Sequence, residues 1–428
     1  MVFVLMAVAV LVLLVAVHRY VWRRFVGDTT APGGMARRAG TVAVWLLPLL
    51  SLGALVSGRV GAPFWLQRAL AWPGYLWLAA LLYLTLALLV GEAVRPVLRR
   101  FLAHREGRGA EVGPGPAESA PSRPGTVARE AAARDVSPFA AHGGPAPAAP
   151  VTAGPSRRLF VARAVGGAAA VAGLGTVGYG AYSVLRGPQV KRVTVPLAKL
   201  PRAAHGFRIA VVSDIHLGPV LGRAHTQRIV DTINRTQPDL IAVVGDLVDG
   251  TVADLGPAVE PLAQLSARHG SFFVTGNHEY YSGAAPWIEH VRELGLHPLE
   301  NTRVEIEGFD LAGVNDIAGQ GEGQGPDFDR ALGGRDRTRA AVLLAHQPVV
   351  IDDAVACGVD LQLSGHTHGG QLWPGNYLAE LANPTAAGLE RYGDTQLYVS
   401  RGAGAWGPPV RVGAPSDITV VQLASRQA

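Results

Sequence analysis

The chain has 428 residues, of which 49% are apolar and 17% charged, and its formal net charge at neutral pH is +5. A chain this apolar and this poor in charge does not have the composition of an ordinary soluble protein, and membrane segments are expected to account for the excess. The single cysteine, Cys357, excludes an intrachain disulfide framework. The length favours two or three structural units.

Three long apolar runs near the N-terminus predict membrane-spanning helices. They cover residues 1–17, about 41–57 and about 74–94. Each is close to the length that crosses ~30 Å of hydrocarbon at ~1.5 Å per residue. A signal peptide is the alternative for the first run, but no basic segment precedes its apolar core. We therefore expect three transmembrane helices within residues 1–104.

The composition changes in residues 105–157, which are rich in Pro, Ala, Gly and Ser. With little to bury, this segment is predicted to be a disordered linker. Residues 164–185 are uncharged and rich in Gly and Ala, so residues 158–187 are expected to hold a fourth transmembrane helix. The sequence SRRLF at 156–160 resembles the twin-arginine export signal. The twin-arginine translocation machinery is therefore a candidate partner, and the alternative is a charged flank of the fourth helix.

The distribution of arginines predicts the orientation in the membrane. Arginines are frequent between the first and second spans and between the third and fourth, whereas only Arg59 and Arg68 lie between the second and third. Loops rich in Arg and Lys remain cytoplasmic. The N-terminus and everything after residue 186 are therefore expected outside the cytoplasm of a bacterial cell, on a multi-pass protein of the cell membrane. Three spans instead of four would reverse the orientation of the C-terminal part.

Residues 190–428 have the pattern of a globular α/β domain. Short apolar runs that indicate strands, such as FRIAVVS and DLIAVVGD, alternate with amphipathic stretches. In one such stretch, Ile229, Val230 and Ile233 have helical spacing. Later strands are predicted at residues 309–314, 341–345, 360–364, 396–400 and 417–423.

Five of these apolar strands end in Asp, Asn or His. In chain order the motifs are SDIH, GD, GNHE, a lone His and GHTH. Because the carboxyl ends of strands in an α/β sheet share one edge, these side chains are expected to converge in one crevice. Carboxylate, amide and imidazole ligands without thiolate suit Mn, Fe or Zn. The set is too large for one ion and predicts two divalent ions about 3.5–4 Å apart, bridged by a carboxylate.

The ordered set D-x-H, G-D, G-N-H-E, H and G-H-x-H resembles the calcineurin-like metallophosphoesterase superfamily over residues 200–425. Five blocks in this order are highly specific. With the apolar N-terminus, GNHEYY and GHTHGGQ are similar to a membrane-anchored bacterial branch of exported phosphodiesterases related to UDP-2,3-diacylglucosamine pyrophosphatases. The resemblance implies a four-layer αββα sandwich in residues 190–428, preceded by an N-terminal transmembrane helical region.

The resemblance also implies a role for each motif position. His278 would protonate the leaving oxygen without binding metal, and Glu279 would orient His278. Seven side chains would be metal ligands: Asp214, His216 and His368 on the first ion, Asn277, His346 and His366 on the second, and Asp246 as the bridge between them.

Other residues near the motifs are left with open roles. Asp249 is expected either to orient a ligand or to cap a turn. Residues 315–337, rich in Gly and Asp, are expected to form a solvated mobile loop, with an active-site cover as the alternative. No sequence argument places Gly402, Gly404 or Arg411 at the site.

These features favour a membrane-tethered phosphoesterase that cleaves a phosphodiester or pyrophosphate bond by attack of a hydroxide activated by two metal ions. The expected substrate is a phosphoester of the envelope, such as a lipid or lipid-linked compound. No nucleic-acid partner is expected, because the domain has no Arg/Lys-rich run with interleaved aromatics. The alternative is a transmembrane sensing or transport module with an appended non-catalytic or accessory phosphoesterase-like domain. Apart from Glu92 the spans have almost no ionisable residues, which favours anchoring.

Overall fold

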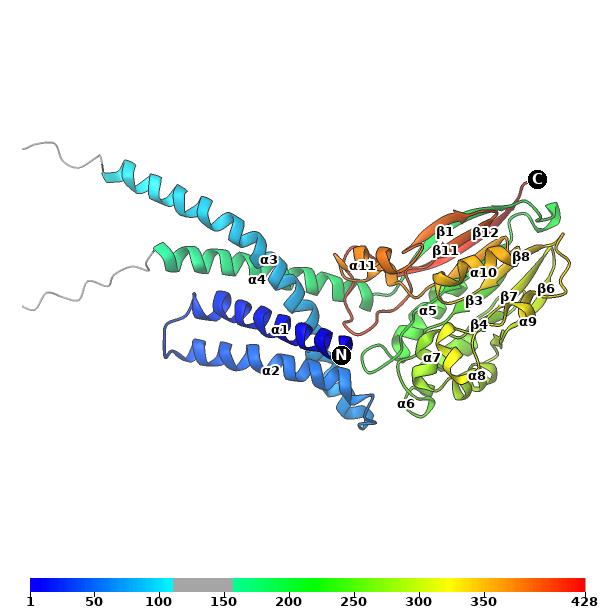
Figure 1. The fold of residues 1–428 in the computed structure, drawn as a ribbon, viewed down its shortest axis with the longest axis horizontal. Helices are drawn as coiled ribbons and strands as arrows, with labels where there is room; N and C mark the ends of the chain where they lie inside the picture. Colours follow the sequence, from blue (N-terminus) through cyan, green and yellow to red (C-terminus); the bar gives the residue numbers. More distant parts are fainter. Residues whose placement is uncertain (111–156, 428) are drawn as a thin grey trace, which may run out of the picture.

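The computed structural model describes residues 1–110 and 157–427. A bundle of long helices and an α/β domain lie end to end along the longest axis (Figure 1). Residues 105–110 continue a helix instead of starting the predicted linker, and the rest of that linker lies outside the described residues. The bundle consists of α1 (Val2–Trp22) with a π-helical turn (Arg23–Gly27), α2 (Met35–Ser57), α3 (Phe64–Ala110) and α4 (Arg157–Leu185).

Four helices of the described chain are long and apolar enough to cross a membrane. The third extends well beyond the predicted run 74–94, because α3 continues through polar residues on both sides of that run. The helices approach one another closely at glycines. A Cβ at Gly173 of α4 would lie 3.0 Å from the backbone nitrogen of Leu84 in α3. Small residues of this kind allow close packing of membrane helices.

The α/β domain contains two six-stranded sheets. In the first sheet β2 to β5 are parallel, and β12 is antiparallel to β2 and parallel to β1. In the second, β7, β8, β9 and β11 are parallel, with antiparallel β6 and β10 at the edges. The first sheet has the order β1 (Gln189–Leu197), β12 (Asp417–Ser425), β2 (Arg208–Val212), β3 (Leu240–Val244), β4 (Ser271–Val274) and β5 (His297–Pro298). The second has the order β10 (Gly388–Tyr392), β11 (Thr395–Val399), β9 (Leu361–Ser364), β8 (Ala340–Leu344), β7 (Phe309–Gly313) and β6 (Thr302–Ile306).

The two sheets pack face to face and helices cover their outer faces, which confirms the predicted αββα sandwich. The largest apolar cluster joins residues of both sheets, such as Val211 of β2 and Leu344 of β8. Because both faces of the central strands are covered, their sequences are continuous apolar runs. The helices on the first sheet are α5 (Arg223–Arg235), α6 (Val252–Val259) and α8 (Ala284–Glu293). Those on the second are α9 (Phe328–Leu332) and α10 (Ile351–Ala356).

The predicted loop at residues 315–337 contains regular structure. It forms a 3-10 helix (Ile317–Glu322) and α9. Asn301 Oδ1 accepts hydrogen bonds from the backbone nitrogens of Asn315 and Asp327, both at 3.0 Å. Many residues of this segment are exposed, in line with the expected solvated loop, but Asn and Asp side chains supply caps and turns that composition alone does not reveal.

The domain docks on the bundle through two loops, one before α11 (Gly375–Ala382) and one before β12. The hydroxyl of Tyr83 in α3 donates to the carbonyl of Trp373 at 2.9 Å. The backbone nitrogen of Arg411 donates to the carbonyl of Gly180 in α4 at 3.3 Å. Val410 and Val412 pack with the apolar core of the bundle. Both hydrogen bonds therefore connect apolar helices to loops of the α/β domain.

We predict that Gly180→Val weakens this docking. A Cβ at Gly180 would lie 2.6 Å from Val410 Cγ1, whereas at Gly178 no described atom lies within 4 Å. Overpacking of this kind costs about 1–3 kcal/mol. Thermal unfolding of the full chain in detergent should show a lower midpoint for Gly180→Val and an unchanged one for the control Gly178→Val. Equal midpoints for both variants would contradict the docking described here.

Candidate active site

The predicted ligands follow the carboxyl ends of β2, β3, β4, β8 and β9, where the two sheets present a common edge. The chain turns sharply at most of them. Positive φ values are uncommon for residues other than glycine, cost about 1–3 kcal/mol, and concentrate at functional sites. Five of the seven predicted ligands have this conformation: Asp214 (52°), His216 (49°), Asp246 (53°), His366 (74°) and His368 (52°).

The glycines of the motifs bring the backbone close to these side chains. A Cβ at Gly245 would lie 2.6 Å from His346 Nδ1, and one at Gly276 would lie 2.5 Å from the backbone nitrogen of Asp246. Any larger residue would displace a predicted ligand. The glycine in G-D and the one in G-N-H-E are therefore required by close approach.

The structure brings the predicted ligands of the first ion together. Asp214, His216 and His368 are buried, and their donor atoms lie within 4.8 Å of one another. His368 Nε2 is 3.0 Å from His216 Nε2 and 3.4 Å from Asp214 Oδ1. The backbone nitrogen of His366 donates to Asp214 Oδ1 at 2.9 Å and fixes that carboxylate.

A second cluster contains the predicted ligands of the second ion. Asp246, His346 and His366 form it, and His366 Nδ1 lies 2.9 Å from Asn277 Oδ1. His346 Nε2 is 3.2 Å from Asp246 Oδ2. All seven predicted ligands therefore meet at one edge of the sandwich.

Asp246 lies between the two clusters. Its Oδ2 atom is 3.6 Å from His216 Nε2 in the first cluster and 3.2 Å from His346 Nε2 in the second. Its other oxygen, Oδ1, accepts a hydrogen bond from the backbone nitrogen of His278 at 2.9 Å. One oxygen is thus fixed by the backbone while the other faces both clusters, as a bridging carboxylate requires.

The donor atoms fit two divalent ions. Two ligand atoms ~2.1 Å from one ion at about a right angle lie ~3 Å apart, which matches the 3.0 to 3.4 Å separations in the first cluster. His346 Nε2 is buried without a hydrogen-bond partner among the described residues. His346 Nδ1 lies 2.9 Å from the carbonyl of Val244, and His216 Nδ1 lies 3.0 Å from Asp249 Oδ1. Each ring can therefore donate through Nδ1, which would leave Nε2, directed into the site, available to an ion.

Because the site is buried, the charges of its carboxylates and imidazoles strongly affect one another's pKa. Burial raises the pKa of Asp214. Burial acts to lower the pKa of His216, but Asp249 and Asp246 outweigh it and raise the pKa to about 9. For Asp246, burial acts to raise the pKa, and His346 and His216 hold it below its usual range. The buried carboxylates thus depend on nearby positive charge, which imidazolium groups or metal ions supply.

His278 lies at the rim of this site. Its Nδ1 atom is 2.6 Å from Asp249 Oδ1, and its ring packs edge-on against His216, with centroids 4.7 Å apart. The Trp406 ring lies on another side, at 5.9 Å. Asp249 therefore contacts both His216 and His278, which favours its predicted orienting role over a turn cap.

The prediction that Glu279 orients His278 was wrong. The Glu279 carboxylate is fully buried and accepts backbone N–H groups from Asp246 (3.0 Å), Leu247 (2.7 Å) and Gly276 (2.6 Å). Glu279 thus ties together the loop of Asp246 and the loop of Asn277. The contact with His278 that was assigned to Glu279 is made by Asp249. The resemblance suggested a contact that the helical turn of α7 (Asn277–Ser282) prevents, because neighbouring side chains on a helix diverge.

Arg411, Gly402 and Gly404 also belong to the site. Arg411 is buried, and its guanidinium donates to the carbonyl of His368 at 3.2 Å and lies 2.9 Å from His368 Nδ1. The backbone nitrogen of Gly404 donates to the carbonyl of Asp214 at 2.8 Å. A Cβ at Gly402 would lie 2.5 Å from Asp214 Cβ. No sequence argument placed them there, because their partners, Asp214 and His368, lie far away in the chain.

Comparison with known proteins agrees with this geometry. The calcineurin-like phosphoesterase family matches residues 207–370. A metallophosphoesterase of Helicobacter pylori strain J99 is 38% identical over 58% of this chain and 68% of its own length. One from Aquifex aeolicus is 35% identical over 57% of this chain and 95% of its own length. The chain belongs to the calcineurin-like metallophosphoesterase family.

The family extends to proteins with membrane segments. A transmembrane protein with metallophosphoesterase domain from Danio rerio is 39% identical over 57% of this chain. The match spans about three fifths, 59%, of that relative's length. Among solved structures, a dimetal phosphatase from Danio rerio is similar with a TM-score of 0.38 and 12% identity, covering 51% of this chain and 93% of that one. The names of these relatives specify no substrate.

We predict that the main effect of Glu279→Ala is a loss of folding stability, and not a loss of the catalytic step alone. It leaves three buried backbone N–H groups unpaired, and each unpaired group costs about 1–3 kcal/mol. Thermal unfolding of the full chain should show a clearly lower midpoint for Glu279→Ala. The comparison variant Asp249→Asn should keep the midpoint and lose turnover. A Glu279→Ala protein with the parent's midpoint and reduced turnover would restore the orienting role.

Proposed function

We propose that the chain is a metal-dependent phosphoester hydrolase that cleaves a phosphodiester or pyrophosphate bond with two divalent ions. The observation that carries the proposal is the pair of ligand clusters with Asp246 between them, its Oδ2 atom 3.6 Å from His216 Nε2 in one and 3.2 Å from His346 Nε2 in the other. The ligand set of carboxylate, amide and imidazole groups suits Mn, Fe or Zn. When bound, such ions supply an activated water at neutral pH and neutralise charge on the phosphoryl oxygens.

Side chains around the two clusters hold the catalytic groups in position. His278 is fixed through Nδ1 by Asp249, so Nε2 is free to donate a proton to the leaving oxygen. Such general acid catalysis contributes typically 10²–10⁴-fold. Glu279 keeps the Asp246 and Asn277 loops in register through their backbone nitrogens. Arg411 holds the loop of His368 by donating to its backbone carbonyl.

We further propose that the substrate is a lipid or lipid-linked phosphoester in the membrane surface. The helix α11 (Gly375–Ala382) follows the ligand His368 closely and has no buried residue. Its exposed side chains include Tyr377, Leu378 and Leu381, the last with 84% of its surface exposed. Exposed apolar and aromatic residues on one short helix are typical of insertion at a membrane interface.

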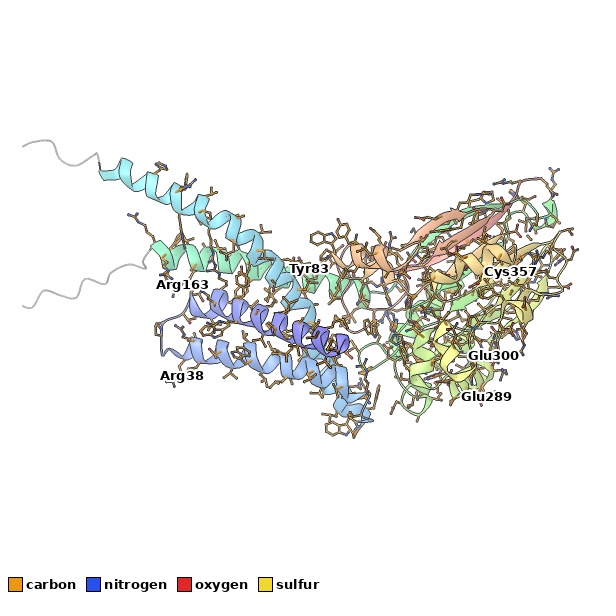
Figure 2. The ribbon with its side chains drawn as sticks, in the orientation of Figure 1. Arg38, Tyr83, Arg163, Glu289, Glu300 and Cys357 are labelled. Atoms are coloured by element: carbon orange, nitrogen blue, oxygen red, sulfur yellow. The ribbon has the colours of Figure 1, made fainter. Side chains whose placement is uncertain are left out.

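The position of α11 supports this proposal. It lies beside the end of the bundle that faces the domain (Figure 1). Tyr83, labelled in Figure 2 at that end, donates to the carbonyl of Trp373 just before α11. A bilayer that surrounds α3 would therefore reach the exposed side of α11. The active site would open near the head groups, which favours lipid-borne substrates.

The same arrangement supports an extracytoplasmic catalytic domain on a bacterial multi-pass membrane protein. Arg38 and Arg163 lie at the end of the bundle away from the domain (Figure 2). Because arginine-rich ends remain cytoplasmic, the domain would be outside. Export of the domain by the twin-arginine machinery is part of the same proposal.

The bundle residues favour anchoring over transport. Glu92, the main ionisable residue within the predicted spans, pairs with Arg24 at 2.8 Å and accepts from the Tyr20 hydroxyl at 3.1 Å. A carboxylate neutralised by fixed partners near the end of a predicted span serves structure or binding there more readily than an ion path.

We predict Mn²⁺-dependent hydrolysis of bis-p-nitrophenyl phosphate by the full chain in detergent. A chelator should abolish turnover, and Asp246→Asn should lose it with the shared ligand. His278→Ala should lower turnover about 10²–10⁴-fold while the ions, measured by elemental analysis, stay bound. Loss of both ions from His278→Ala would show that His278 is a ligand. If the folded, metal-loaded parent hydrolyses no diester, pyrophosphate or monoester, the proposed hydrolase activity is contradicted.

A second prediction separates the lipid substrate from the chemistry. The double variant Leu378→Glu/Leu381→Glu should hydrolyse phosphatidyl-p-nitrophenol in proteoliposomes at least about fivefold more slowly, because charged groups resist burial in the interface. Its rate on soluble bis-p-nitrophenyl phosphate should stay within about twofold of the parent. The control Val355→Glu alters an exposed residue of α10 and should affect neither rate. Equal loss on both substrates would contradict an interfacial role for α11.

A further inference from the structure

A cavity of about 610 Å³ is lined by residues of the helical bundle. The helix segments that line it lie at the end of the bundle away from the α/β domain (Figure 1). The π-helical turn after α1, the second half of α3 and the start of α4 form its walls. Five guanidinium groups and two carboxylates line it, so its formal charge is five minus two, or +3. The arginines are Arg23, Arg24, Arg95, Arg99 and Arg158.

The two carboxylates are already used by Arg24. Its Nη1 atom lies 2.9 Å from Asp28 and its Nη2 atom 2.8 Å from Glu92. Arg95 is only 5% exposed and reaches the same carboxylates at 3.9 and 3.5 Å. Its Nε and Nη2 atoms are buried and have no hydrogen-bond partner among the described residues. Buried donors of this kind normally have partners, so Arg95 points to an anionic ligand.

The side chains that line the cavity indicate which class of anion it binds. A guanidinium presents its donors in a planar fork that matches two oxygens of a phosphate. Basic cavities between membrane helices on the cytoplasmic side bind phosphorylated head groups, and the arginine pattern predicts that this end is cytoplasmic. Arg158, from the SRRLF sequence that resembles an export signal, lines the cavity and so has a role in the folded protein.

We propose that this cavity binds a phosphoryl group, carried by the head group of an anionic membrane lipid. Arg95 makes the buried contact, and Arg23, Arg99 and Arg158 supply the excess positive charge at the rim. The site is separate from the predicted metal ligands, which lie in the α/β domain, whereas residues of the helical bundle line the cavity. It therefore does not depend on the hydrolase being active.

The test measures lipid retention by the full chain with native mass spectrometry. The purified protein is titrated with phosphatidylglycerol and, in parallel, with phosphatidylcholine. Arg99→Gln and Arg95→Gln are compared with Arg100→Gln, which removes the same charge from the next residue of α3 without touching the cavity. A third arm adds inorganic phosphate to protein in nanodiscs of neutral lipid.

We expect the parent protein to retain phosphatidylglycerol. Its affinity for this lipid should fall about tenfold in Arg95→Gln and several-fold in Arg99→Gln, and should not change in Arg100→Gln. Since Arg95 is buried, the exposed Arg99 keeps the test valid if Arg95→Gln fails to fold. Binding of inorganic phosphate that Arg99→Gln weakens would support the phosphoryl site and identify a soluble source. Equal retention of both lipids together with no phosphate binding would overturn the proposed phosphoryl site. Equal loss of phosphatidylglycerol affinity in Arg99→Gln and Arg100→Gln would overturn it as well.

Discussion

The position of the Asp246 carboxylate is the constraint on which the rest of the site depends. Its Oδ2 atom lies between imidazoles from the two clusters, and its Oδ1 atom is held by the backbone of His278. Such a placement requires a left-handed backbone at Asp246 and glycine at Gly245 and Gly276. The carboxylate of Glu279, buried behind the loops, compensates by binding the backbone nitrogens that these turns leave unpaired.

The sandwich extends this constraint to the whole domain. Two parallel sets of strands end at one edge, so residues from β2 to β9, far apart in sequence, reach one centre. The same edge meets the bundle. The backbone of Arg411 bonds to Gly180 of α4, while its guanidinium bonds to the carbonyl of His368. A single residue thus connects a predicted membrane helix to a predicted metal ligand, and the position of the bundle and the geometry of the site are coupled.

The four-layer sandwich and the roles of the seven predicted ligands were implied by the resemblance to the family. Sequence reasoning alone predicted an α/β domain with polar residues gathered at one edge of the strands, because both of these depend on local signals. Apolar runs identify buried strands, and polar residues directly after them identify the shared edge. It failed where the signal is not local. Glu279 was assigned to its neighbour His278, whereas its partners are backbone groups of other loops. Arg411 was left without a role, because no pattern in a sequence indicates which of many arginines folds back onto a histidine 43 positions earlier.

The most direct test of the central claim is anomalous diffraction from crystals of the full chain grown with Mn²⁺. The structure predicts two peaks on either side of Asp246 Oδ2, about 3.5–4 Å apart, one beside His216 and one beside His346. A single peak, or two peaks that do not share Asp246, in crystals of the folded protein would contradict a dinuclear centre.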